Sequence, residues 1–313
     1  MSESRLRGPG VTAALLAVTA AALLAIPLAG SNYVIRLATV MAMYAVLALS
    51  WNFIGGMAGY PSFATAAFFG LGAYTSGILQ ARGVPMLAAW PAAALVAALF
   101  AAALGLVLLR LRGHYFAIAS LVVAEVLREL TNSWTALTGG GMGLNLPILR
   151  IGVTRQAQLY YAAMVGLALL TLAAAVLVRR GRLGFGLRTI QQNEAAAAMV
   201  GLDTTRAKTA AFTLSATFVG AAGGIYASWV NYIDPADVYD VLLSVKPIVM
   251  ALLGGVGTVL GPLLGAVVFL ALEELVWRRF LYIHAGLLGL IIVALIYFLP
   301  RGLLAVRRRA AAA

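Results

Sequence analysis

Long apolar runs follow one another along nearly the whole chain, separated by short polar connections. The runs are continuous and do not alternate between apolar and polar at every second position, so they indicate membrane-spanning helices and not barrel strands. A helix needs about 20 apolar residues, each rising about 1.5 Å, to cross the hydrocarbon core. The pattern predicts ten spans, at residues 11–29, 33–54, 62–80, 86–109, 115–131, 157–178, 207–230, 241–254, 259–277 and 283–299.

The composition agrees with this pattern. Of the 313 residues, 63% are hydrophobic and 10% are charged, which is more apolar surface than a soluble core of this size could bury. We therefore expect an all-α polytopic integral membrane protein that forms one domain, residues 1–313. The span at 241–254 fits least well, because it is short and contains Lys246 and Pro247. The run at 11–29 resembles a signal peptide, but its length and the spans after it favour a retained first helix.

The net charge of +12 arises almost entirely from arginine. In a membrane protein such residues gather at the cytoplasmic ends of helices, so binding of nucleic acid is not expected. Ten crossings place both termini on one side, and that side holds about twice as many Lys and Arg residues as the other. The sequence therefore predicts a multi-pass protein with both termini in the cytoplasm.

The longest polar interruption covers residues 179–208, between the sixth and seventh spans. Its charge places it in the cytoplasm by the same rule. Asn193 can cap a short helix over residues 194–200, and Gly201 can end that helix in a left-handed conformation. A short helix at this face would offer a soluble partner a place to dock. The basic residues of the stretch are Arg179, Arg180, Arg182, Arg188, Arg206 and Lys208.

Two glycine-rich stretches interrupt the apolar pattern, IGGMAGYPS at 54–62 and LGGVGTVLGPLLG at 253–265. Glycine and proline weaken helices, so these stretches could be broken helices whose ends line a transport path. Tight turns at the membrane surface are the simpler interpretation, and we favour it. Small residues also recur four positions apart, as at Gly220 and Gly224, and this spacing permits close helix packing in lipid.

Polar groups inside the predicted spans are candidates for the translocation path. Glu125 and Arg128 lie three residues apart on one helical face and should form an ion pair, which either lines the path or is purely structural. Asn52, Ser62 and Thr65 are further candidates. Serine and threonine also bond the backbone of their own helix, which is the simpler explanation for those two residues.

The sequence lacks the motifs of several kinds of site. It has no cysteine, HExxH or GxSxG motif and no cluster with metal-ligand spacing, so no catalytic residue, metal or other cofactor is expected. Neither lysine belongs to a GxxxxGK(S/T) phosphate loop, so the ATPase of any ATP-driven pump would be a separate chain. Asp234, Asp237 and Asp240 in the outer segment 231–240 form either a solvated loop or a docking surface for an external partner.

Several blocks carry a family resemblance. They are LSWNFIGGMAGYPSFATAAFFGLGAYTSGIL at 49–79, RLRGHYFAIASLVVAEVLRELTNSWTALTGGGMGL at 110–144, RLGFGLRTIQQNEAAAAMVGLDTTRAKTAAFTLSA at 182–216, LLGGVGTVLGPLLGA at 252–266 and FLPRGL at 298–303. Together they cover most of the chain. They resemble LivM-type permease subunits of branched-chain amino acid ABC importers, which lie in the bacterial inner membrane.

The resemblance implies a role, partners and coupling residues. The chain would be a permease, not an enzyme, paired with a second related permease, two cytoplasmic ATP-binding cassette ATPases and a periplasmic or extracellular amino-acid-binding protein. Ten spans with a long loop after the sixth are similar to the permease fold of cobalamin-type importers. Residues 179–208 would be the coupling loop that touches an ATPase. Within it, EAA followed by glycine is similar to the importer EAA element, although the common pattern has the glycine one residue closer. The implied coupling residues are Arg188, Gln192, Asn193, Glu194, Ala195, Ala196 and Gly201.

One departure leaves the substrate open. FATAAFF at 63–69 replaces a more usual SLGHAAFF-like run. If this segment contributes to selectivity, urea and short amides are alternatives to branched-chain or other hydrophobic amino acids. A different class, an ion-coupled secondary transporter, would need ionisable residues near the bilayer midplane, and only Glu125 with Arg128 approaches that requirement.

Overall fold

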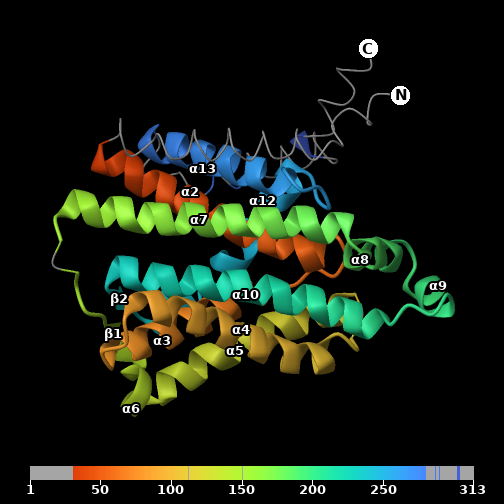
Figure 1. The fold of residues 1–313 in the computed structure, drawn as a ribbon, viewed down its shortest axis with the longest axis horizontal. Helices are drawn as coiled ribbons and strands as arrows, with labels where there is room; N and C mark the ends of the chain where they lie inside the picture. The colour runs from red at the N-terminus through yellow and green to blue at the C-terminus, as the bar shows by residue number, and fades with distance from the viewer. Residues whose placement is uncertain are drawn as a thin grey trace.

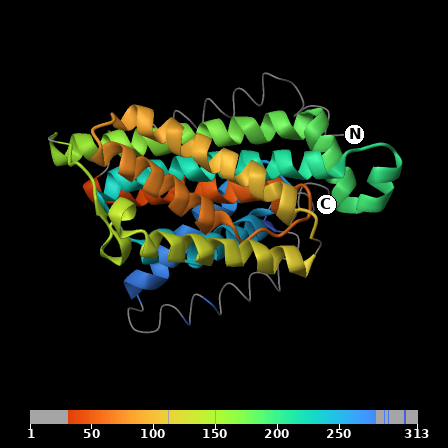
Figure 2. The same ribbon diagram turned by 90° about the horizontal axis from the view of Figure 1, so that it is seen from below.

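The computed structural model describes residues 31–111, 113–149, 151–279, 286, 289, 302 and 303. Long helices lie side by side in one bundle, and their connections gather at its two ends (Figures 1 and 2). The elements in chain order are α2 (Asn32–Trp51), the π-helical turn η2 (Asn52–Gly56), α3 (Thr65–Ala81), α4 (Met86–Leu108), α5 (His114–Ser133), α6 (Thr135–Thr138), the 3-10 turn η3 (Gly140–Met142), β1 (Leu144–Asn145), α7 (Val153–Arg180), α8 (Arg182–Gln192), α9 (Glu194–Met199), α10 (Thr204–Val230), β2 (Tyr232–Ile233), α11 (Pro235–Val238), α12 (Leu242–Gly254) and α13 (Gly261–Arg279).

The two ends of the bundle differ. At one end α8 and α9 project beyond the long helices, and we call this the coupling end (Figures 1 and 2). At the other, β1 and β2 form a two-stranded antiparallel ribbon in which Leu144 pairs with Ile233 and Asn145 with Tyr232. We call this the ribbon end, and it also holds α6 (Figure 1). α7 therefore runs from the ribbon end to the coupling end, and α10 runs back.

Four of the described helical segments are long and apolar enough to cross a membrane. They are Asn32–Gly56, Met86–Leu108, Val153–Arg180 and Thr204–Val230, each at a predicted span. α3, α5, α12 and α13 coincide with four more predicted spans, but α3 has 17 residues and α12 only 13. The spans at 11–29 and 283–299 lie outside the described residues, apart from Gly286 and Gly289. An all-α membrane protein is thus confirmed, while the count of ten spans stays a prediction.

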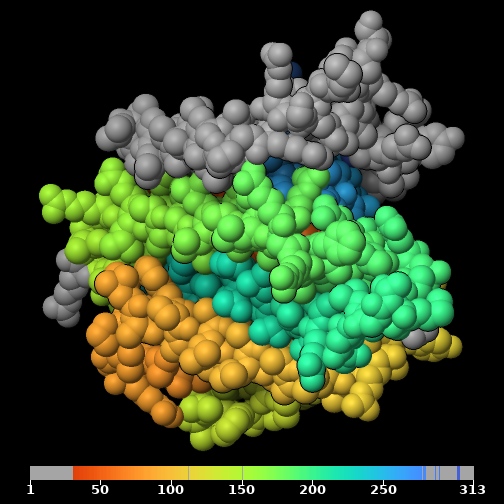
Figure 3. Space-filling view, turned by 45° about the vertical axis from the view of Figure 1, so that its right-hand side comes forward, coloured from red at the N-terminus to blue at the C-terminus, as the bar shows by residue number. Residues whose placement is uncertain are grey.

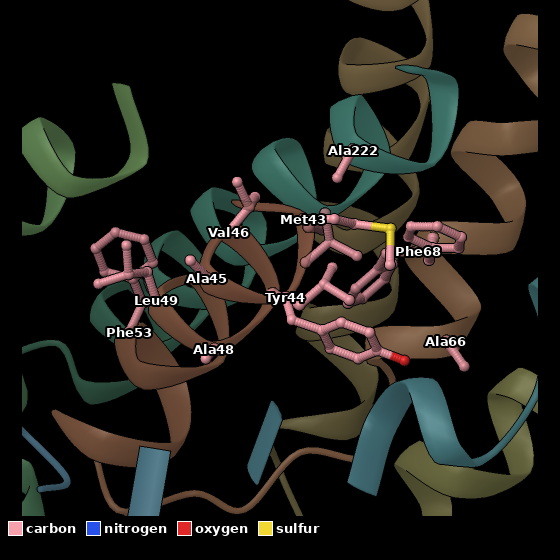
Figure 4. Packing of buried hydrophobic residues seen from close by; sticks show 14 of the residues in the cluster. Met43, Tyr44, Ala45, Val46, Ala48, Leu49, Phe53, Ala66, Phe68 and Ala222 are labelled. Carbon is pink, nitrogen blue, oxygen red and sulfur yellow. The ribbon is translucent and has the colours of Figure 1, made fainter. Parts of the chain in front are cut away.

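α10 lies near the centre, between α2 and the pair α3 and α4 (Figure 1). α2 in turn packs against α7, α10, α12 and α13. Figure 4 shows Met43 of α2 beside Phe68 of α3, with Ala222 of α10 nearby, and all three residues are buried. The core is apolar because these helices are apolar on several faces, as expected of helices in the interior of a membrane bundle.

Small residues allow α3, α4 and α10 to approach closely. A Cβ placed on Gly220 of α10 would overlap the Cβ of Ala97 in α4, and one on Gly72 of α3 would overlap the backbone of Gly220. Hydrophobic drive between helices is small in lipid, so this close packing is what holds them together. The expectation of ordinary helix packing is confirmed for Gly220.

The structure of α12 accounts for Lys246 and Pro247, the two residues that made 241–254 a poor candidate for a span. Pro247 lies inside the helix. The Lys246 Nζ lies 2.7 Å from Glu273 Oε1 of α13 and 5.7 Å from the centre of the Tyr44 ring. A lysine in an apolar segment is tolerated when a carboxylate compensates its charge, so α12 depends on α13 for its stability.

Candidate coupling site and translocation path

Residues 179–208 are mostly helical, which corrects the prediction of a loop with one short helix. α7 continues to Arg180, and after Gly181 the chain forms α8, which was not predicted. α8 packs through Leu187 and Ile190, which are almost completely buried. Their spacing of three residues, continued from Gly184, is the helical signal that could have revealed α8.

α9 is the short helix that the sequence predicted. The Asn193 side-chain oxygen accepts a hydrogen bond of 3.1 Å from the backbone N–H of Ala196, which caps the helix. Gly201 follows with φ of 84°, a left-handed conformation that favours glycine. The helix ends at Met199, one residue before the predicted end.

The free end of this region is apolar. Met199 and Val200 are 82% and 79% exposed, and Phe185 of α8 is 70% exposed. We call these three residues the apolar tip. Figure 3 shows α8, α9 and the start of α10 as one continuous surface at the coupling end. Exposed apolar side chains of this kind are typical of a protein or membrane interaction site.

Most of the coupling residues implied by the resemblance are accessible, with one exception. Arg188 is exposed, and its Nη2 donates a hydrogen bond of 3.4 Å to the Arg179 carbonyl. Glu194 instead turns inward, with 16% of its side chain exposed. The exposed members of the set are Arg188, Gln192, Asn193, Ala195 and Gly201, and Ala196 is half-buried.

Glu194 belongs to a buried polar cluster. Its Oε1 lies 2.6 Å from the Nζ of Lys208, whose side chain is 3% exposed. The Tyr60 hydroxyl donates to Glu194 Oε2, and Lys208 also donates 3.0 Å to the carbonyl of Leu109 at the end of α4. Sequence reasoning missed Tyr60, and it named Lys208 only as one of the basic residues of the 179–208 stretch. Lys208 lies three and four residues before the buried Ala211 and Phe212, and this phase placed it on the inner face of α10.

A second contact joins α8 to the first glycine-rich stretch. Gln191 Nε2 donates a hydrogen bond of 3.0 Å to the carbonyl of Gly56. A Cβ on Gly59, which has φ of 77°, would lie 3.2 Å from the Gln191 side chain. The coupling region therefore touches the chain immediately after α2 at two places, here and at Tyr60.

The two glycine-rich stretches pack against each other. Asn52 is fully buried. Its side chain donates a hydrogen bond of 2.8 Å to the Thr258 carbonyl and accepts one of 2.8 Å from the N–H of Gly257. The first stretch consists of a π-helical turn followed by an irregular, mostly buried segment at residues 57–64. The favoured prediction of a simple tight turn is therefore wrong for this stretch, because buried contacts on both sides stabilise the interrupted helix.

The irregular segment ends at the N-terminus of α3, which serines cap. The Ser62 hydroxyl accepts a hydrogen bond from the N–H of Ala64. The Ser120 hydroxyl of α5 accepts a hydrogen bond of 2.8 Å from the N–H of Phe63. The Ser244 hydroxyl of α12 accepts 2.9 Å from the N–H of Ala66. The first N–H groups of a helix have no partner within the helix, so these hydroxyls allow α3 to begin inside the protein. Thr65, its first residue, is buried.

Glu125 and Arg128 form the predicted ion pair, with 2.5 Å between Oε1 and Nη2. Their side chains are 55% and 39% exposed, so α5 presents the pair on its open face. Arg128 also lines a cavity of about 410 Å³ with Asn132, Gly141, Asp234, Pro235 and Ala236. The structure thus joins Asn52, Ser62 and Thr65 along one stretch of chain and places Glu125 and Arg128 apart from them on α5.

No set of three His, Cys, Asp or Glu residues that could hold a metal ion occurs within the described part of the chain. The polar groups brought together are hydroxyls, amides and paired charges, and several of them satisfy the N–H groups at helix ends.

Comparisons with known proteins identify the family of the chain. The family model described as "Branched-chain amino acid transport system / permease component" matches residues 33–300. The chain is 29% identical to the high-affinity branched-chain amino acid transport system permease protein LivM of Salmonella typhimurium, over 88% of this chain and 70% of that protein. It is also 29% identical to LivM of Escherichia coli, over 90% and 72%. Identity to the permease protein LivH of Salmonella typhimurium is 22%, over 76% and 82%.

No solved structure matches the chain. The family match covers most of the chain, including the coupling region and both glycine-rich stretches. The chain therefore belongs to the family of branched-chain amino acid transport system permease components, which confirms the predicted function class, the permease subunit of an ATP-binding cassette importer.

Proposed function

We propose that the coupling end of this permease docks on a cytoplasmic ATP-binding cassette ATPase through the apolar tip and the exposed coupling residues. The observation that carries the proposal is the exposure of Met199 and Val200 on a helix that projects beyond the bundle. The flanking arginines keep this end in the cytoplasm, and burying the apolar tip in a groove of the partner would stabilise the complex. Two ATPases and a second related permease complete the transporter.

The translocation path in this proposal runs past residues 57–64 and the start of α3. Serine side chains of α5 and α12 cap the buried start of α3. The irregular backbone before α3, which includes the exposed Pro61, therefore lies beside these two helices. Irregular backbone inside a membrane protein is tolerated where it is packed by protein or lines a cavity. The ten-span count, the cobalamin-type arrangement and the cytoplasmic position of both termini belong to the same proposal.

The ribbon end would receive the substrate from an amino-acid-binding protein. Arg128 and Asp234 line the same cavity there, and opposite charges suit the carboxylate and ammonium groups of an amino acid. The substrate we propose is a branched-chain or other hydrophobic amino acid. In proteoliposomes of the complete transporter, leucine uptake should be reduced by excess isoleucine and unaffected by excess urea. Competition by urea alone would assign the amide-type substrate instead.

Copurification tests the docking. Wild-type permease extracted in mild detergent should bring two ATPase chains with it, whereas an ion-coupled carrier would come alone. Met199→Asp places a charge in the apolar tip and should reduce the recovered ATPase at least about tenfold, because burying an unpaired charge is unfavourable. Met142→Asp is the matched control, since Met142 is 85% exposed near the ribbon end. Equal ATPase recovery from both variants would contradict the proposal.

A further inference from the structure

The Lys208 ammonium is the most buried charge of the coupling region. Its side chain is 3% exposed, and it donates to Glu194 Oε1, to the Leu109 carbonyl and to the Tyr60 hydroxyl at 2.6, 3.0 and 3.1 Å. An ammonium group has three donors, and all three are used. A buried charge is tolerated only with this degree of compensation, so the geometry around Lys208 is closely specified.

Tyr60 completes the cluster from the opposite side. Its hydroxyl donates to Glu194 Oε2, while Lys208 donates to Oε1 of the same carboxylate. The Lys208 ammonium also lies 4.4 Å from the centre of the Tyr60 ring, a cation–π contact. The ring packs edge-on against Phe116 of α5, with 5.5 Å between centres. The cluster therefore joins α9, α10, the end of α4 and the irregular segment 57–64.

We propose that Tyr60, Glu194 and Lys208 form the link that converts displacement of α9 into movement of the segment before α3. The inference rests on the proposed docking of α9 on an ATPase. Glu194 then acts inside the permease and not as a direct ATPase contact, and Tyr60 and Lys208 are positioning residues for transport. All three residues lie in the permease chain, so the force crosses from α9 to the path without a contribution from the partner.

The position of Glu194 supports a mechanical role. It is the first residue of α9, a six-residue helix whose opposite end, around Met199 and Val200, is exposed. Force applied to the exposed end pulls on Glu194, and Glu194 cannot leave Lys208 without uncovering a buried charge. The three side chains must therefore move together.

The chain beyond Tyr60 leads directly to the path. Ser62 follows two residues later and caps the N–H of Ala64. The indole N–H of Trp51 donates 2.8 Å to the Ser62 carbonyl. A shift of Tyr60 consequently changes the hydrogen bonds that define the start of α3. A transporter needs two arrangements that ATP binding favours differently, and the capped start of α3 can supply them.

Tyr60→Phe isolates the hydroxyl, because it keeps the ring and its packing on Phe116. In the complete transporter reconstituted with its ATPases and binding protein, leucine taken up per ATP hydrolysed should fall at least about tenfold, because the variant loses both charge-assisted hydrogen bonds of the hydroxyl, the one to Glu194 and the one from Lys208. ATPase recovery and ATP hydrolysis should be retained. Tyr74→Phe is the matched control, since the Tyr74 hydroxyl is buried and accepts or donates no hydrogen bond within the described residues. It should leave the ratio unchanged.

The double variant Glu194→Gln with Lys208→Met separates coupling from stability. Removing both charges leaves no buried ion unpaired, so the protein should fold and assemble far better than with Lys208→Met alone. Our proposal expects this double variant to hydrolyse ATP without leucine uptake. Wild-type uptake per ATP in the double variant would overturn the link and leave the docking proposal intact. If the wild-type permease recovers no ATPase, the docking proposal itself is wrong.

Discussion

At the scale of single residues, Asn52 joins the two glycine-rich stretches through both ends of its amide. Asn52→Ala removes two buried hydrogen bonds and leaves the Thr258 carbonyl and the Gly257 N–H without their partner. Each loss costs about 1–1.5 kcal/mol, so we expect roughly 2–3 kcal/mol of destabilisation. Thermal unfolding in detergent should show the corresponding drop in midpoint.

Ser50→Ala is the control for that substitution. Ser50 lies two residues earlier in the chain and is also fully buried, but its hydroxyl has no hydrogen-bond partner among the described residues. Its loss should change the unfolding midpoint little. Equal effects of the two substitutions would show that the amide of Asn52 adds nothing beyond its packing.

Local rules at this scale explain what the sequence could and could not predict. Asn193 as a helix cap and Gly201 after the helix follow from side-chain and backbone chemistry within a few residues, and both predictions are confirmed. Tyr60 is 134 residues from Glu194 and 148 from Lys208. No local pattern indicates a contact over that separation, so the cluster could be found only from the packed helices.

At the scale of elements, the packing of α3, α4 and α10 depends on the absence of a side chain at Gly220. Gly220→Ala would force the new methyl against Ala97 of α4, and such overpacking costs about 1–3 kcal/mol. The variant should unfold at a lower temperature in detergent. Gly166→Ala in α7 is the control, because a Cβ there meets nothing within 4 Å.

Alanine favours a helix over glycine by up to about 1 kcal/mol at both positions. That gain is common to the two variants, so the difference between their unfolding midpoints reports the helix contact alone. If Gly220→Ala is as stable as Gly166→Ala, α4 and α10 do not touch as closely as the structure shows.

Prediction of elements succeeded where the apolar run was long. The spans at 86–109 and 207–230 correspond closely to α4 and α10, because length and hydropathy alone define them. It failed for α8, in which apolar residues, glycines and polar residues are mixed over only 11 residues, and for residues 57–64, whose buried irregular backbone is stabilised by serines on other elements. Contacts between distant parts of the chain override local propensity at such places.

At the scale of the whole molecule, the bundle places two chemically different ends far apart. The coupling end carries arginines and the apolar tip, while the ribbon end carries aspartates and the cavity beside Arg128. α7 connects the two ends in a single helix of 28 residues, about 42 Å at about 1.5 Å per residue. That length exceeds the hydrocarbon core of a bilayer, so Arg179 and Arg180 can reach water while the remainder of α7 crosses.

Cysteine labelling can test this orientation directly, because the natural chain has no cysteine. Met199→Cys and Met142→Cys place single thiols at 82% and 85% exposed positions near opposite ends of the bundle. A membrane-impermeant maleimide should label position 142 in spheroplasts and position 199 in inverted vesicles, since arginine-rich segments remain in the cytoplasm. Both thiols should react after solubilisation in detergent, which controls for accessibility.

In inverted vesicles, position 199 should react faster after the ATPases are removed with urea, because they cover the apolar tip. Labelling of both positions from one side would show that α7 does not cross the membrane, and exchanged sides would place the coupling region where no cytoplasmic ATPase can reach it.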